Sequence, residues 1–171
     1  DVCSSDLLSE ELEKRLPFPF FAGWGISFDV VDAYKNAATA LSACKKDQNH
    51  YTFLVTESQE MVGPLNSNRS ISYSLKPHAQ TSSLAKSLGI SPINLEKIIS
   101  LQKERSMYEF TSSDLVYFLE ITPRSASRIL SKLSSADLAH PVRTINLNGT
   151  GRPLTVYEID FSNIKEFWGS H

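Results

Sequence analysis

Apolar residues in the first 65 positions recur at intervals that predict two helices and three strands. The first helix is expected over residues 5–16, and an aromatic-rich strand over residues 20–28. Asp29 is a natural N-cap for the second helix. The apolar positions of that helix, which are spaced to form one face, are Val30, Ala33, Tyr34, Ala37, Leu41 and Cys44. Short strands are expected over residues 51–56 and 61–65.

From residue 66 onward the pattern changes. Residues 66–80 are rich in serine and asparagine and lack a clear period, so we expect a linker with some strand character at residues 71–75. Residues 81–161 contain four predicted helices followed by a strand, a turn and a second strand. Residues 162–171 are expected to form a tail or a short helix.

The start signals of the later helices are strong. Ser91-Pro92 places a capping residue before a proline at the first helical position, and Thr111 with Asp114 resembles a capping box. Thr122-Pro123 repeats the first signal only three residues after Leu119. Two helices separated by so short a turn are typical of a helix-turn-helix.

The helix that begins at Pro123 has two contrasting faces. Its apolar stripe consists of Ala126, Ile129, Leu130 and Leu133. The opposite face carries Arg124, Arg128, Ser131 and Ser135, with Ser127 and Lys132 beside it. The planar guanidinium group of arginine can donate hydrogen bonds to guanine O6 and N7 at the same time, or to the oxygens of a phosphate. The pattern therefore predicts a DNA-reading helix over residues 122–135, and the alternative is a basic face that meets only solvent.

A two-stranded ribbon is expected after this helix. Its strands cover residues 142–147 and 154–159, joined by a glycine-containing turn at residues 148–151. Arg143 and Arg152 place positive charge on or near this ribbon, where contact with backbone phosphate or the minor groove is common. A plain surface hairpin is the alternative.

The stretch EFTSSDLVYFLEITPRSASRILSKL, followed by GRPLTVYEI, resembles the winged helix domains of bacterial transcription regulators over residues 92–160. The resemblance implies that Arg124, Ser125, Ser127 and Arg128 occupy recognition-helix positions and that Arg152 is the wing arginine. Together with the helix and ribbon patterns, it gives a predicted set of DNA-binding residues: Thr122, Arg124, Ser125, Ser127, Arg128, Ser131, Lys132, Arg143 and Arg152.

The segment FAGWGISFDVVDAYKNAATALSACKKDQNHYTFLV resembles part of a GGDEF or nucleotide-cyclase-like domain without its catalytic motif. The resemblance implies a degenerate sensor or dimerisation module over residues 1–65. Gly23 and Gly25 are interpreted as sites of close backbone packing rather than as a phosphate loop. The expected fold class is α+β: a partial ferredoxin-like or cyclase-like segment followed by a winged helix-turn-helix.

Charge is unevenly distributed although the net charge is only −2. Residues 1–65 hold five basic and ten acidic side chains, whereas residues 66–171 hold twelve and nine. Between residues 121 and 152, five basic side chains are balanced by Asp137 alone. This stretch suits a phosphate-rich partner.

Catalytic chemistry finds little support in the sequence. The four histidines lack metal-ligand spacing, no Gly-x-Ser-x-Gly elbow occurs, and we predict no catalytic residue, metal or cofactor. Cys3 and Cys44 are expected to be free thiols in a reducing cytoplasm, with Cys44 in a core. No apolar run is long enough for a membrane span, and because the chain starts at Asp1 we expect upstream sequence to be missing.

These patterns predict a cytoplasmic transcription regulator that binds double-stranded DNA as a homodimer and responds to an unidentified small-molecule effector. Two alternatives remain open at this point. The winged helix serves protein–protein assembly, or it is an accessory to a degenerate nucleotide-binding sensor.

Overall fold

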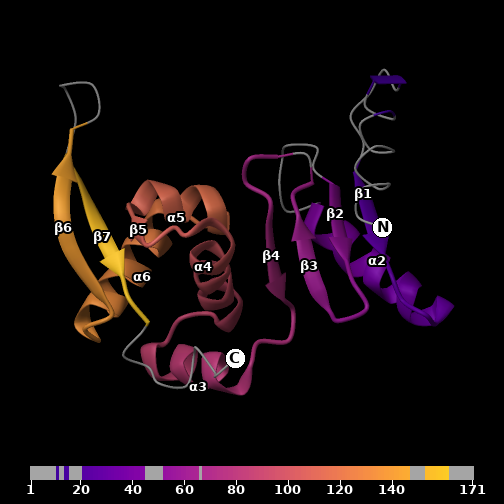
Figure 1. Cartoon of the computed structure of the whole chain (residues 1–171), viewed down its shortest axis with the longest axis horizontal. Helices are drawn as coiled ribbons and strands as arrows, with labels where there is room; N and C mark the ends of the chain where they lie inside the picture. Colours follow the sequence, from indigo (N-terminus) through magenta and orange to yellow (C-terminus); the bar gives the residue numbers. More distant parts are fainter. Residues whose placement is uncertain are drawn as a thin grey trace. The chain divides into compact units, whose positions relative to one another are not determined.

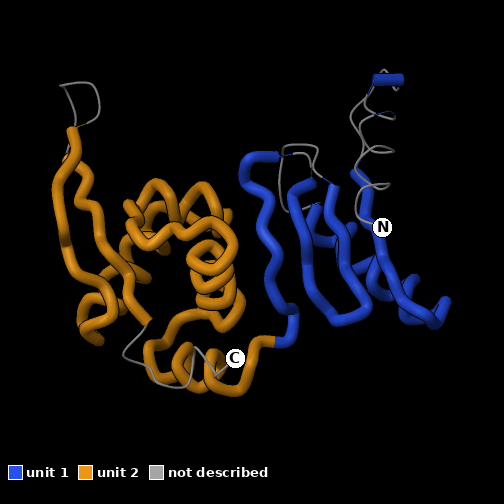
Figure 2. Tube along the Cα trace, in the orientation of Figure 1, with its two compact units in different colours: residues 1–76 blue, residues 77–171 orange. Residues whose placement is uncertain are grey.

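Two compact units make up the chain, residues 1–76 and residues 77–171 (Figures 1 and 2). A computed structural model describes residues 11, 14–15, 21–44, 52–65, 67–146 and 153–161. Both helices and strands occur in it, so the fold is α+β as expected. Most of the helix predicted over residues 5–16, and the tail at residues 162–171, lie outside the described residues.

The first unit is a four-stranded sheet with one helix. Its elements are β1 (Ala22–Gly25), α2 (Val30–Cys44), β2 (Thr52–Val55), β3 (Glu60–Gly63) and β4 (Ile71–Ser74). The strands follow one another in the order β1-β2-β3-β4. The α2 crossover makes β1 and β2 parallel, and the remaining pairs are antiparallel. All four residues of β2 are buried, so the centre of the sheet is also the core of the unit.

Backbone contact between β1 and α2 explains the two glycines of β1. A Cβ atom at Gly23 would lie 2.5 Å from the carbonyl oxygen of Ala37. One at Gly25 would lie closer than 3.0 Å to the backbone of both Ala33 and Ala37. The prediction of close packing at these positions is therefore confirmed, because no side chain fits between strand and helix.

The buried face of α2 differs from the predicted one. Val30 and Tyr34 are 82% and 76% exposed, whereas Asn36 and Ala40 are buried. The prediction was wrong for Val30 and Tyr34 because contact with the β1 backbone favours small side chains over large ones. Asn36 is tolerated inside because its amide donates to the carbonyls of Ile26 (3.0 Å) and Thr56 (3.2 Å).

Two further features of α2 agree with the sequence. The carboxylate of Asp29 accepts hydrogen bonds from the backbone of Val31 (2.8 Å) and Asp32 (3.1 Å), which confirms its capping role. Cys44 is a free, buried core residue at the other end of the helix. Burial raises the pKa of its thiol, which keeps the side chain neutral.

The strand character expected at residues 71–75, within the predicted linker of residues 66–80, is confirmed. Residues 71–74 form β4, which pairs with β3, and α3 begins at Ala79. Ile71 and Tyr73 are buried while the serines between and after them are partly exposed. This alternation has the two-residue period of a strand, which is the signal that the sequence carries at residues 71–75.

The second unit packs four helices against a small sheet. Its elements are α3 (Ala79–Leu88), α4 (Pro92–Arg105), β5 (Glu109–Phe110), α5 (Ser112–Leu119), α6 (Pro123–Ser135), β6 (Ala139–Ile145) and β7 (Leu154–Ile159). The antiparallel sheet has the order β5-β7-β6. Large side chains from every layer are fully buried, among them Leu95, Ile98, Leu101, Phe110, Leu115, Leu133 and Ile159. Strand β6 starts earlier than the predicted residue 142, because Ala139 already pairs with Ile159.

Helix ends in this unit follow the sequence signals closely. Thr111 and Asp114 form a complete capping box at α5: the Asp114 amide donates to the Thr111 hydroxyl (3.2 Å) and the Thr111 amide donates to the Asp114 carboxylate (2.7 Å). Ser91 occupies the N-cap of α4, but its side chain makes no capping hydrogen bond.

None of the helices in the described part of the chain is long and apolar enough to cross a membrane.

Gly25→Ala should destabilise the first unit by about 1–3 kcal/mol, because the added methyl group must push α2 away from β1. Urea unfolding followed by circular dichroism measures the loss. Ala38→Ser, on the exposed side of the same helix, is the matched control and should cost no more than about 0.5 kcal/mol. Equal stability of Gly25→Ala and the wild type would contradict the close contact.

Candidate nucleic-acid interface

The connection between α5 and α6 is only three residues long. Glu120 ends α5 in the left-handed conformation, and its amide donates to the carbonyl of Val116 (3.1 Å). Thr122 then caps α6: its hydroxyl accepts from the amide of Ser125 (3.2 Å), and Pro123 follows at the first helical position. The predicted tight turn is therefore confirmed, and it fixes the direction in which α6 leaves α5.

Helix α6 is strongly two-faced. The predicted apolar stripe is buried in full: Ala126, Ile129, Leu130 and Leu133. After Pro123 at the first position, the exposed positions are Arg124, Ser127, Arg128, Ser131 and Ser135. No acidic residue occurs anywhere in the helix, so the outward face is uniformly basic or hydroxylic. This arrangement confirms the face assignment made from the sequence.

Arg124 and Arg128 are exposed and make no ion pair or hydrogen bond with any residue that the structure describes. Arg128 lies beside a small hollow of about 220 Å³ that also involves Ser125 and, from the α4 side, Ser91 and Asn94. Both guanidinium groups therefore retain their donors for a partner.

Lys132 is placed differently from the two arginines. Its ammonium group donates to the carbonyl oxygen of Gly89, the residue that ends α3 in the left-handed conformation. The positive charge thus lies at the negative end of the α3 dipole. Lys132 connects α6 to the turn between α3 and α4, a role that sequence spacing did not indicate.

Arg143 is already paired. Its guanidinium donates to the Glu109 carboxylate (2.8 Å between Nη1 and Oε1), and the second nitrogen, Nη2, is ion-paired to the other oxygen, Oε2. The structure therefore does not support Arg143 as an open phosphate contact. Glu109 lies on β5, far away in sequence, so only the sheet reveals the pair. Arg152 and the turn at residues 148–151 lie outside the described residues.

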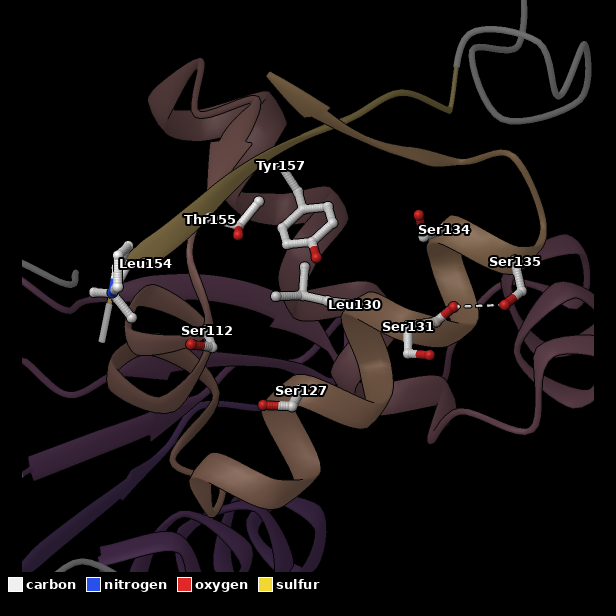
Figure 3. Close-up of a pocket in the computed structure, with 10 residues that line it drawn as sticks. Ser112, Ser127, Leu130, Ser131, Ser134, Ser135, Leu154, Thr155 and Tyr157 are labelled. Atoms are coloured by element: carbon white, nitrogen blue, oxygen red, sulfur yellow. Dashed lines mark hydrogen bonds between the residues drawn. The ribbon is translucent and has the colours of Figure 1, made fainter. Parts of the chain in front are cut away.

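A groove of about 770 Å³ runs between α6 and β7, and we call it the hydroxyl groove (Figure 3). Thr155 and Tyr157 line its strand side, while Ser127 and Ser131 line its helix side. The described residues that line it are Ser112, Ser127, Leu130, Ser131, Ser134, Ser135, Pro153, Leu154, Thr155 and Tyr157. Of the predicted site residues that the structure describes, Ser127 and Ser131 belong to it. Thr155 and Tyr157 were missed because β7 returns to α6 only in the folded chain.

Comparison with known proteins adds no family assignment: no protein-family model matches the chain, and no curated protein or solved structure is significantly similar to it. Within the described ranges, no cluster of three or more histidine, cysteine, aspartate or glutamate side chains is arranged to hold a metal ion. The chemistry that the described surface of α6 offers is hydrogen-bond donation, from two guanidinium groups and a row of hydroxyl groups.

Thr122→Ala should lower the free energy of unfolding by about 1 kcal/mol, because the first turn of α6 loses the acceptor for the Ser125 amide. Thermal unfolding measures the change. Thr122→Ser keeps the hydroxyl and serves as the matched control, with nearly wild-type stability expected. If the alanine and serine variants are equally stable, the cap contributes nothing.

Proposed function

We propose that this chain is a transcription regulator that binds double-stranded DNA through a winged helix-turn-helix in residues 77–171. Helix α6 is the recognition helix, and β6 with β7 forms the wing. One observation carries the proposal: α6 buries its whole apolar stripe and presents Arg124 and Arg128, unpaired within the described residues, on a face without acidic side chains. The element order of the unit also supports the resemblance found in the sequence.

The physical argument concerns what such a face recognises. The major groove of DNA admits an α-helix, and each base pair presents a distinct donor and acceptor pattern there. An exposed arginine bonds two acceptors of guanine at once, while neighbouring hydroxyl groups bond phosphates. Helix α6 therefore supplies base reading and register on one surface.

The first unit is proposed to be a degenerate sensor or dimerisation module, as its partial likeness to cyclase-like domains implies. Its parallel β1–α2–β2 crossover, with glycines under the helix, supports that likeness in outline. An unidentified small-molecule effector and a cytoplasmic location belong to the same proposal.

Protein–protein assembly is the second candidate, and one observation favours it. Tyr108 and Tyr117 are each 47% exposed in the second unit, and exposed aromatic side chains are enriched at protein interfaces. The dependence of binding affinity on salt concentration distinguishes the two functions. DNA affinity falls steeply with salt because counterions are released, whereas an aromatic interface changes little.

The double variant Arg124→Ala with Arg128→Ala tests the DNA proposal. A preferred duplex is first selected from a random pool with the wild-type chain, and affinities are then measured by fluorescence anisotropy. Each good base-edge contact contributes about 1–3 kcal/mol, so the pair should lose at least 30-fold in affinity for that duplex. The fold should stay intact because both side chains are exposed.

A matched control removes the same two charges elsewhere. Lys103 and Arg105 are exposed in the last turn of α4. The hollow beside Arg128 is bordered by the first turn of α4, at the opposite end of that helix. Their double alanine variant should keep specific affinity within about threefold, because its main effect on DNA is reduced long-range attraction. Arg105 also lies over the ring of Phe118 (5.3 Å), so the stability of this variant is measured alongside. Wild-type affinity in the Arg124 and Arg128 variant, or failure of the wild type to select any sequence, would contradict the proposal.

The same proposal predicts a homodimer at micromolar concentration, since one recognition helix covers too few base pairs for useful genomic specificity. Exposed apolar side chains in the first unit offer an interface: Phe28 is 95% exposed, and Val30 and Tyr34 stand beside it in sequence. Sedimentation equilibrium measures the oligomeric state. The double variant Phe28→Ser with Val30→Ser should shift the equilibrium toward the monomer. A monomeric chain bound once to an asymmetric site would refute the prediction.

A further inference from the structure

The hydroxyl groove offers a chemistry that the two arginines do not. No charged side chain occurs in its described lining, and its hydroxyl groups come from three elements: α5, α6 and β7. We propose that this groove holds the sugar–phosphate backbone of one DNA strand through neutral hydroxyl donors. The inference rests on the proposed function and deepens it, because it names the part of the DNA that lies between the recognition helix and the wing.

The first step is that the donors are available. The side chains of Ser112, Ser127, Ser131, Thr155 and Tyr157 make no hydrogen bond within the described part of the chain. Ser135 differs, because its hydroxyl donates to the carbonyl of Ser131 (2.8 Å, dashed in Figure 3). Free hydroxyl groups on both walls are suited to phosphate oxygens, which accept such bonds in protein–DNA complexes.

The second step is that the donors form rows. Ser127, Ser131 and Ser134 recur every three or four residues of α6, which separates them by about 4.5–6 Å along the helix axis. On the facing wall Thr155 and Tyr157 are two residues apart on one face of β7, or about 6.7 Å. Two rows of repeated donors suit a polymer of phosphates better than a single small anion.

The third step is the character of the lining. Pockets for small molecules are mostly apolar, with a few polar groups that orient the ligand. Among the described lining residues, Leu130, Pro153 and Leu154 are apolar, against seven hydroxyl side chains. Ser127 and Ser131 belong both to the groove and to the exposed face of α6 that carries Arg124 and Arg128, so a DNA strand bound beside those arginines can extend into the groove.

Two double variants test the inference, one for each wall. Ser127→Ala with Ser131→Ala removes hydroxyl groups from α6, and Thr155→Val with Tyr157→Phe removes them from β7 while keeping the side-chain shape. Each pair should weaken binding about tenfold. The loss should be equal for preferred and random duplexes, because phosphate contacts carry no sequence information. The slope of log affinity against log salt should stay at the wild-type value, since no cation is lost.

The matched control is Ser113→Ala, which removes an exposed hydroxyl next to Ser112 in sequence but outside the groove. It should bind DNA like the wild type. Duplexes with single phosphates replaced by uncharged methylphosphonate then locate the contact. At the phosphate held in the groove, this replacement should weaken the wild type but change the groove variants little.

The outcomes separate this inference from the proposed function. A wild-type chain that binds no DNA overturns both. Specific DNA binding that is lost only in the Arg124 and Arg128 variant, with wild-type affinity in both groove variants, overturns the groove assignment alone. A groove variant that changes preference at one base pair, or alters the salt slope, also overturns it, because the hydroxyl groups would then read bases or act through charge.

Discussion

The buried stripe of α6 is the constraint on which the proposed interface depends. Ala126, Ile129, Leu130 and Leu133 are all buried in the second unit. At about 100° per residue, their burial leaves one orientation of the helix, and with it one set of outward side chains. Thr122 and Pro123 fix the start of the helix, so its register as well as its rotation is determined. Arg124 and Arg128 face outward because burial of the apolar stripe places the opposite side of the helix at the surface.

The described basic side chains on and near this helix fall into two groups: some bond to other parts of the unit, and others are exposed without a partner. Lys132 bonds the carbonyl of Gly89 and ties α6 to the neighbouring helix turn, and Arg143 is neutralised by Glu109 across the sheet. Arg124 and Arg128 have no such partner among the described residues. Among the described residues, net charge alone therefore overstates the number of cations open to a phosphate-rich partner, and Arg124 and Arg128 on α6 are two that remain open.

The first unit is held together by a different constraint. Gly23 and Gly25 allow the α2 backbone to rest directly on β1, and this contact sets which side of α2 is buried. Small side chains and the hydrogen-bonded Asn36 therefore face inward, while Phe28, Val30 and Tyr34 remain exposed. A large exposed apolar patch commonly marks an interaction surface.

Much of the second unit follows from the sequence by itself. Caps and helical periods are local, so Thr111 with Asp114, Thr122 with Pro123, and the two faces of α6 were all predictable from residues within one or two turns of each other.

Other features join distant segments. Glu109 and Arg143 meet because β5 and β6 flank β7, and Tyr157 faces the serines of α6 because β7 returns along it. In the first unit, the helical spacing of apolar residues predicts that Val30 and Tyr34 lie on the inner face of α2, but the glycine contact at β1 places the small side chains there instead. Local hydrogen bonding and periodicity thus determined the helices of the second unit, the caps of α5 and α6, and which face of α6 is exposed. Only tertiary packing decided which basic side chains stay unpaired and which hydroxyl groups share a groove, because those relations depend on contacts between residues far apart in the chain.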